Sequence, residues 1–278
     1  MFYLCLSPMN EFELEEIRDS QKTATIDCET RESAFHSVSE ILGLTRTDLT
    51  SFFRQFDLWD YVEKHGYGEE GPGNLLLKIL LMQTKCNWGF SHTAWFHMTR
   101  CLPTEEFRDG LKTYSGIIDH IWELLFKINP SDTTRSDWNK LRMSMESDMS
   151  SNLGIYHDCR TRSDEQEGPY GILVCELRTE GVLKQDHYLE EAPEIVSHIC
   201  EKDRNLLEAF KKVTKPCIIK FETTDNELYL LSTALLYVYE SQLSEPQFGN
   251  FHNADYRGKG ITIHPDQIKK IMILSITD

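Results

Sequence analysis

From about residue 90 onward the chain is a series of short apolar runs separated by turns, and this pattern restricts the possible folds most. Three runs are rich in aromatic or β-branched residues, which is typical of strands: 94–96, 171–175 and 216–221. Stretches with helical character lie between and after them, at 117–126, 192–200 and 229–239. The strands are too short and too irregularly spaced for regular βαβ units. The pattern therefore predicts an α+β fold with a mixed or antiparallel sheet.

The remaining segments of this region give further local predictions. Residues 260–263 predict a short strand, and residues 268–276 predict a partly stranded segment after a turn at Pro265. Residues 130–152 are rich in Ser, Asp, Met and Thr, and predict a surface loop or a mobile insertion.

The first quarter of the chain has a different character. Residues 1–70 hold 15 acidic and 6 basic side chains, a net charge of -9 by subtraction, against -16 for the whole chain. Apolar residues recur at helical spacing over 35–42 and again over 49–56, which predicts two short amphipathic helices. Thr47 is the predicted cap of the second helix.

A cluster of Gly and Pro at 66–73 interrupts the chain before a buried helix or strand at 75–82. This punctuation predicts a division into two parts. Residues 1–84 would form an acidic helical N-terminal region, and residues 85–278 would form the main domain.

Charge and composition exclude several classes of protein. A net charge of -16 disfavours a broad surface for phosphate backbones or anionic lipid, although only -7 of it falls within residues 71–278, so a nucleic-acid partner stays open. The eight cysteines include no Cys-x-x-Cys pair, and we expect free thiols and no metal site. The apolar N-terminus does not have the pattern of a signal peptide, and no apolar run approaches 18 residues. We therefore expect a cytoplasmic protein without a membrane partner.

The most informative string is Trp95-Phe96-His97-Met98-Thr99-Arg100, where a predicted strand ends on a histidine. His97 and Thr99 are two residues apart and therefore share one face of a strand, where they could hydrogen-bond a sugar diol. The alternative is a histidine that is satisfied within the core or at its rim. About ten residues later the string Phe107-Arg-Asp-Gly-Leu111 follows.

This spacing resembles the first conserved region of the ADP-ribosyltransferase fold, the group of the poly(ADP-ribose) polymerases, the diphtheria-type toxins and the RNA 2′-phosphotransferases. The resemblance implies a split sheet that binds NAD as a substrate. It implies that His97 contacts the ribose, that the backbone of Met98 holds the nicotinamide amide and that Thr99 supports them, with Arg100 as a further contact. The family has a glycine where this chain has Met98, whose side chain would narrow the nicotinamide site.

A second string, Gly168-Pro-Tyr-Gly171, resembles the tyrosine-bearing strand of that family. It implies that Tyr170 is a catalytic-site aromatic ring that stacks on nicotinamide, with Tyr156 as the rival candidate. A core tyrosine after a turn would have the same local sequence.

The segment 258–273 resembles the closing strands of the family, but the catalytic glutamate expected there is absent. A carboxylate is expected because cleavage of the nicotinamide bond builds positive charge on the ribose. Four acidic residues could supply it: Glu222, Glu240, Glu245 and Asp255. Pro193 and Glu194 predict a helix start, and the alternative is that His187 or Glu194 acts as an acid or base.

These features predict NAD-dependent transfer of ADP-ribose to a macromolecular acceptor, either a protein or a nucleic acid. By analogy with the family, such a protein could be a cytoplasmic toxin of a toxin–antitoxin or phage-defence system, held by an antitoxin at the acidic N-terminal region. The alternative is a non-catalytic interaction protein that keeps the fold, or an unrelated α+β binding module.

Overall fold

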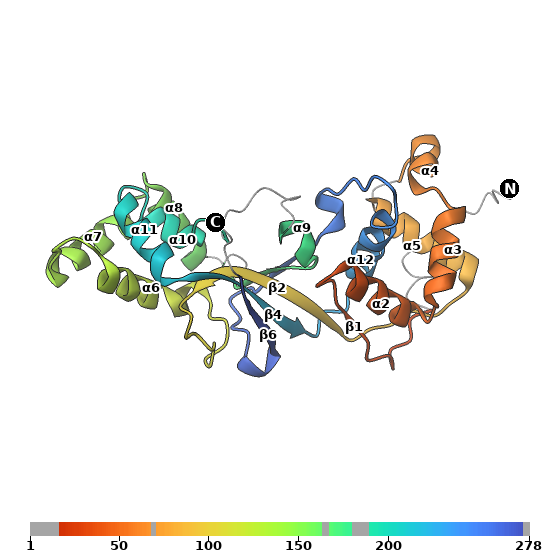
Figure 1. Ribbon diagram of the computed structural model, residues 1–278, viewed down its shortest axis with the longest axis horizontal. Coiled ribbons are helices and arrows are strands. Elements are labelled where there is room, and N and C mark those ends of the chain that lie inside the picture. The colour runs from red at the N-terminus through yellow and green to blue at the C-terminus, as the bar shows by residue number, and fades with distance from the viewer. Residues whose placement is uncertain (1–16, 68–70, 163–166, 180–188, 275–278) are drawn as a thin grey trace. The chain divides into compact units, whose positions relative to one another are not determined.

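The computed structural model describes residues 17–67, 71–162, 167–179 and 189–274, which fall into two compact units (Figure 1). Unit 1 draws its described residues from Met1–Trp95, Ile172–Leu183 and Glu222–Ala254. Unit 2 draws its described residues from Phe96–Gly171, Lys184–Phe221 and Asp255–Asp278.

Unit 1 is mainly helical. Its helical elements are α2 (Arg31–Leu42), α3 (Arg46–Gln55), α4 (Leu58–His65), α5 (Gly71–Thr84), α9 (Cys175–Thr179), α12 (Leu228–Glu240) and the 3₁₀ turn η2 (Asn250–His252). Its short strand β1 (Thr25–Ile26) runs parallel to the start of β2 (His92–Cys101), with Thr25 opposite His92.

Helix α12 is the centre of unit 1 and packs against α5 and α2 (Figure 1). Every residue from Leu230 to Glu240 is buried, as expected for a helix that is apolar on all sides. Gly73 of α5 permits the close approach, because a Cβ atom there would lie 2.8 Å from the carbonyl oxygen of Ser232. The buried segment predicted at 75–82 is therefore a helix.

The two amphipathic helices predicted in the first quarter are confirmed as α2 and α3. The cap predicted at Thr47 is wrong, because α3 begins one residue after Thr45. The Thr45 side chain accepts from the backbone N–H of Asp48, and the Asp48 carboxylate accepts from the backbone N–H of Thr45. This reciprocal pair places the cap of the helix at Thr45, two residues before the predicted cap.

Unit 2 contains most of the sheet and a set of helices beside it. The described strands form a six-stranded sheet in the order β5-β3-β2-β4-β6, with β1 paired to β2 off this path. Besides β1 and β2, the strands are β3 (Tyr170–Ile172), β4 (Lys215–Thr223), β5 (Asp255–Arg257) and β6 (Ile268–Ile273). β4 and β6 are antiparallel, with Cys217 opposite Ile273. The helical elements are α6 (Tyr114–Ile128), α7 (Arg135–Ser147), α8 (Asn152–Arg162), α10 (Glu194–Ile199), α11 (Arg204–Val213) and the 3₁₀ turn η3 (Pro265–Gln267).

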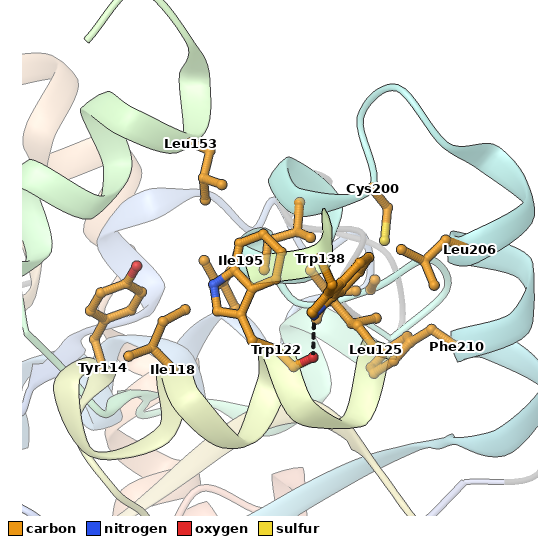
Figure 2. Packing of buried hydrophobic residues seen from close by; sticks show 13 residues of the cluster. Tyr114, Ile118, Trp122, Leu125, Trp138, Leu153, Ile195, Cys200, Leu206 and Phe210 are labelled. Atoms are coloured by element: carbon orange, nitrogen blue, oxygen red, sulfur yellow. Dashed lines mark hydrogen bonds between the residues drawn. The ribbon is translucent and has the colours of Figure 1, made fainter. Parts of the chain in front are cut away.

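The loop predicted at 130–152 is wrong, because most of it forms α7 and the start of α8. Thr134 caps α7 by accepting from the backbone N–H of Asp137. Figure 2 shows why the helix docks: Trp138 lies against Trp122 in the apolar cluster, and its Nε1–H donates to the Trp122 carbonyl oxygen at 3.2 Å. The buried Trp138, with the partly buried Met145, thus holds a largely polar helix on the core.

The α+β class is confirmed, and the sheet is mixed because it contains both a parallel and an antiparallel pair. The sequence predicted a division between residues 84 and 85, whereas the compact units interleave along the chain. The physical reason is the packing of α12, from the C-terminal half of the sequence, against α5 and α2. Within the described ranges, no helix combines the length and apolar character needed to cross a membrane.

Candidate functional site

His97 lies in the part of β2 that belongs to unit 2, and it contacts the neighbouring strand β3. Its Nδ1 atom is 2.7 Å from the carbonyl oxygen of Tyr170. A carbonyl oxygen only accepts, so Nδ1 carries the hydrogen and Nε2 is the unprotonated nitrogen of the neutral ring. Burial is the main cause that lowers the pKa of His97, and the bond to Tyr170 opposes it. The structure therefore brings together two of the predicted site residues, 73 positions apart in the chain.

Met98 and Thr99 follow on the same strand, and both are partly buried. Because side chains alternate along a strand, Thr99 shares the face of His97 and Met98 points to the opposite face. The geometry thus keeps a hydroxyl on the same side as the imidazole. The predicted contacts of Met98 and Thr99 with NAD stay predictions.

Arg100 lies on the opposite face of β2 from His97, and only 5% of it is exposed. Its guanidinium donates to the hydroxyl and carbonyl oxygens of Thr214 and to the carbonyl oxygens of Leu189 and Lys211, at 2.7–3.2 Å. Thr214 is the C-cap of α11, so Arg100 satisfies carbonyl groups at the end of that helix. The structure gives Arg100 an anchoring role and does not group it with His97.

The Tyr170 side chain belongs to a cluster of residues around Arg160 of α8. The Arg160 guanidinium carbon lies 4.5 Å from the centre of the Tyr170 ring and 4.6 Å from the centre of the Tyr156 ring. Burial is the main cause that raises the pKa of Tyr170, and the charge of Arg160 opposes it. Tyr170 and Tyr156 were the two alternatives for the ring that stacks on nicotinamide. Both therefore contact the same cation.

Glu194 and His198 complete this group, which we call the Arg160 cluster: Tyr156, Arg160, Tyr170, Glu194 and His198. Glu194 Oε2 is 3.4 Å from Arg160 Nη2, and Glu194 Oε1 is 3.7 Å from His198 Nε2. The His198 ring lies 5.1 Å from the Tyr156 ring. Arg160 is largely buried, with 15% of its side chain exposed, whereas Glu194 is 41% exposed.

The predicted helix start at Glu194 is confirmed, because α10 begins there directly after Pro193. As the first residue of α10, Glu194 has two interactions. Its negative charge is favourable at the positive end of the helix dipole, and its carboxylate accepts from Arg160 Nη2. His187, the other acid or base considered, lies outside the described residues.

The first and third strings of the resemblance also meet in unit 2. The backbone N–H of Leu111 donates to the carbonyl oxygen of Ile263 at 2.9 Å, and the N–H of Ile263 donates back at 3.0 Å. Gly110 must be a glycine at this contact, since its φ is +78° and a Cβ would lie 2.0 Å from the Ile263 oxygen. Of the strand predicted at 260–263, only Ile263 makes such a pairing among the described residues.

The four acidic residues considered as replacements for the missing glutamate are divided between the two units. Glu222, Glu240 and Glu245 belong to unit 1, and Asp255 begins β5 in unit 2. Glu240 is fully buried, where its carboxylate accepts from the indole N–H of Trp59 at 3.0 Å and from the backbone N–H of Gln247. These bonds explain Glu240 as a structural group of unit 1.

Sequence reasoning missed Arg160. Its signal was the spacing of Tyr156 and Arg160, four residues apart and therefore neighbours on one side of a helix. That signal depends on reading residues 152–162 as helix, and the sequence pattern predicted no helix there.

No group of three or more His, Cys, Asp or Glu side chains suited to a metal ion occurs in the parts of the chain that the structure describes. Comparisons of the chain with protein-family models, with curated proteins and with solved structures found no match.

Proposed function

We propose that the chain transfers ADP-ribose from NAD to a macromolecular acceptor, using a site on β2 and β3 of unit 2. The observation that carries this proposal is the 2.7 Å contact between His97 Nδ1 and the Tyr170 carbonyl oxygen. It joins the two residues that the resemblance to the ADP-ribosyltransferases assigns to NAD. The pairing of Leu111 with Ile263 adds support, since it joins two further segments of the resemblance.

The chemistry required of the site follows from the reaction. The bond between nicotinamide and the ribose C1′ breaks, nicotinamide leaves with the bonding electrons, and an acceptor nucleophile forms a new bond to C1′ while it loses a proton. His97 would accept a hydrogen bond from a ribose hydroxyl at Nε2, because Nδ1 is already bound to Tyr170. Thr99 offers a second polar group on the same face.

Tyr170 would pack against the nicotinamide ring, which fixes the leaving group beside His97. Glu194 is our candidate for the carboxylate that stabilises the developing positive charge. It belongs to the Arg160 cluster, and its charge acts on the Tyr170 hydroxyl by raising the pKa. Arg160 tethers this carboxylate at 3.4 Å.

The test is release of nicotinamide from NAD by the purified chain, with and without cell extract as a source of acceptors. We expect His97→Ala to lower the rate by about 100-fold or more, because a polar contact to the reacting sugar is lost. The matched control is His36→Ala, a change to an exposed histidine of α2, and it should leave the rate unchanged.

Three further variants separate the parts of the site. Tyr170→Phe keeps an aromatic ring and should retain most of the activity, whereas Tyr170→Ala should lose it, although both keep the carbonyl oxygen that binds His97. Glu194→Gln should lower turnover more than it lowers NAD binding. No nicotinamide release by the wild type under any of these conditions would overturn the proposal.

The second candidate function is a binding module without catalysis. Arg160 covers a face of the Tyr170 ring at 4.5 Å, which favours this alternative because the same ring would have to pack against nicotinamide. Met98 in place of the glycine of the family also favours a binding module without catalysis. Equilibrium binding of NAD without any release of nicotinamide would select this alternative.

The acceptor and the regulatory partner belong to the same proposal. We infer a protein or nucleic-acid acceptor, and a basic partner such as an antitoxin at the acidic residues 1–70. Growth arrest on expression of the wild type, but not of His97→Ala, would support the toxin reading.

A further inference from the structure

Two cysteines face each other across the strands β2 and β4, which are neighbours in the sheet. Cys101 is the last residue of β2, and Cys217 lies near the start of β4. The two thiols lie within hydrogen-bonding distance of each other. Both are free thiols, and both belong to unit 2.

The register of the strand pair explains this contact. Thr93 Oγ1 donates to the carbonyl oxygen of Asp225 at 2.7 Å, and Trp95 Nε1 donates to Thr223 Oγ1 at 2.8 Å. Two residues forward along β2 therefore correspond to two residues backward along the partner, as in antiparallel strands. Continued for six residues along both strands from Trp95 and Thr223, this progression would place Cys101 opposite Cys217.

Burial and charge make the two thiols unequal. Cys217 is fully buried, whereas 7% of Cys101 is exposed. Hydrogen bonding with Cys217 lowers the pKa of Cys101, against the opposing effect of burial, and the same contact raises the pKa of Cys217. Cys101 is therefore the thiol with more thiolate character, and it belongs to the less deeply buried residue of the two.

We propose that Cys101 and Cys217 are an oxidisable pair that a hydroperoxide converts into a disulfide across β2 and β4. In the first step the Cys101 thiolate attacks one peroxide oxygen, the O–O bond breaks, and Cys101 becomes a sulfenic acid as hydroxide leaves. In the second step Cys217 Sγ attacks Cys101 Sγ, and the sulfenic oxygen leaves as water with the Cys217 proton. Two thiols and one hydrogen peroxide thus give one disulfide and two waters.

The strand geometry suits this bond. Directly opposite residues of antiparallel strands have Cβ atoms about 4.5–5.5 Å apart, and a disulfide needs about 3.5–4.5 Å. A small approach of the strand ends is sufficient. The bridge would tie the end of β2 next to Arg100, which already anchors the end of α11. This inference concerns the strand ends and does not depend on NAD.

The experiment treats the reduced, purified chain with hydrogen peroxide, blocks the remaining thiols with N-ethylmaleimide under denaturing conditions, and maps the peptides by mass spectrometry. We expect a peptide pair linked through Cys101 and Cys217, and two fewer maleimide adducts than the eight of the reduced chain. Dithiothreitol should restore all eight. This measurement uses the wild type and does not depend on the folding of a variant.

Variants give the matched control. Cys101→Ser and Cys217→Ser should abolish the linked peptide, and Cys217→Ser should leave a sulfenic acid on Cys101 that dimedone traps. Cys200→Ser removes another buried thiol and should leave the yield of the linked peptide unchanged. The proposal is overturned if peroxide oxidises only the exposed Cys159 while Cys101 and Cys217 both remain alkylated.

Discussion

The two nitrogens of the His97 ring have different environments, and this difference defines the candidate site at the scale of single residues. Nδ1 donates to the Tyr170 carbonyl oxygen, so the neutral ring presents Nε2 as an acceptor. Burial lowers the pKa of His97, which favours this neutral form. The same bond orients the ring, because a strand carbonyl is fixed by its own backbone.

We predict that part of the acid sensitivity of folding comes from His97. Its folded pKa is lowered below the ordinary value of 6.5, so below that pH the unfolded chain binds a proton that the folded chain does not. Stability should therefore fall as the pH drops below 6.5, with a slope of up to about 1.4 kcal/mol per pH unit from this residue. Urea unfolding at several pH values measures it.

His97→Gln should reduce that slope, and His36→Gln on the exposed side of α2 should not. His252, whose pKa is also lowered mainly by burial, contributes in the same direction and remains in both variants. Equal slopes in the wild type and in His97→Gln would contradict the prediction.

The site was only partly predictable at this scale. The string 95–100 and the tyrosine at 170 could be found because local sequence carries the resemblance. The position of Arg160 between two tyrosine rings could not, because Tyr170 reaches it from another element. The anchoring role of Arg100 was missed for the same reason, since its acceptors Leu189, Lys211 and Thr214 are 89 to 114 residues away in the chain.

At the scale of elements, the contact between Leu111 and Ile263 holds two irregular segments of unit 2 together. We predict that Gly110→Ala destabilises the protein by more than about 3 kcal/mol. The new Cβ would lie 2.0 Å from the Ile263 carbonyl oxygen, and the positive φ is unfavourable for alanine. Urea unfolding of the variant checks the value.

Gly43→Ala is the matched control. Gly43 also has a positive φ, of +64°, in the left-handed helical region, but the nearest atom to the position its Cβ would take is Lys22 Nζ at 3.7 Å, an ordinary contact distance. This change should cost only about 1–2 kcal/mol. Similar costs for the two variants would show that the close approach at Gly110 is not what makes this glycine necessary.

The helix α7 could not be predicted from its amino-acid composition. Its polar residues predicted a loop, whereas the apolar residues that dock the helix, Trp138 and the partly buried Met145, are few and meet partners from other helices. By contrast, the strand at 94–96 and the helix at 229–239 were predictable, because nearly all their residues are apolar and buried.

We predict that Trp138→Ala costs about 3–5 kcal/mol, because it removes a large buried ring from the cluster of Figure 2. Leu141→Ala on the same helix should change stability by no more than about 0.5 kcal/mol, since Leu141 is 44% exposed. Thermal or urea unfolding compares the two. A small effect of Trp138→Ala would mean that α7 does not dock on this core.

At the scale of the whole molecule, the compact units are built from alternating segments of the chain. The glycine-rich segment at 66–73 marked a change in local pattern, but α5, which begins there, packs with α12 from far along the sequence. Local composition contains no information about such a partner. The α+β class was predictable because it depends on which elements occur, and the units were not, because they depend on which elements meet.

The central claim is that His97, held by Tyr170, binds NAD. The most direct measurement is the ¹⁵N spectrum of the histidine side chains, with His97 assigned by comparison with His97→Ala, recorded with and without NAD. The account predicts a neutral His97 ring protonated at Nδ1, and a change in the Nε2 shift on addition of NAD. A His97 signal that does not respond to NAD, or a ring protonated at Nε2 alone, would contradict it.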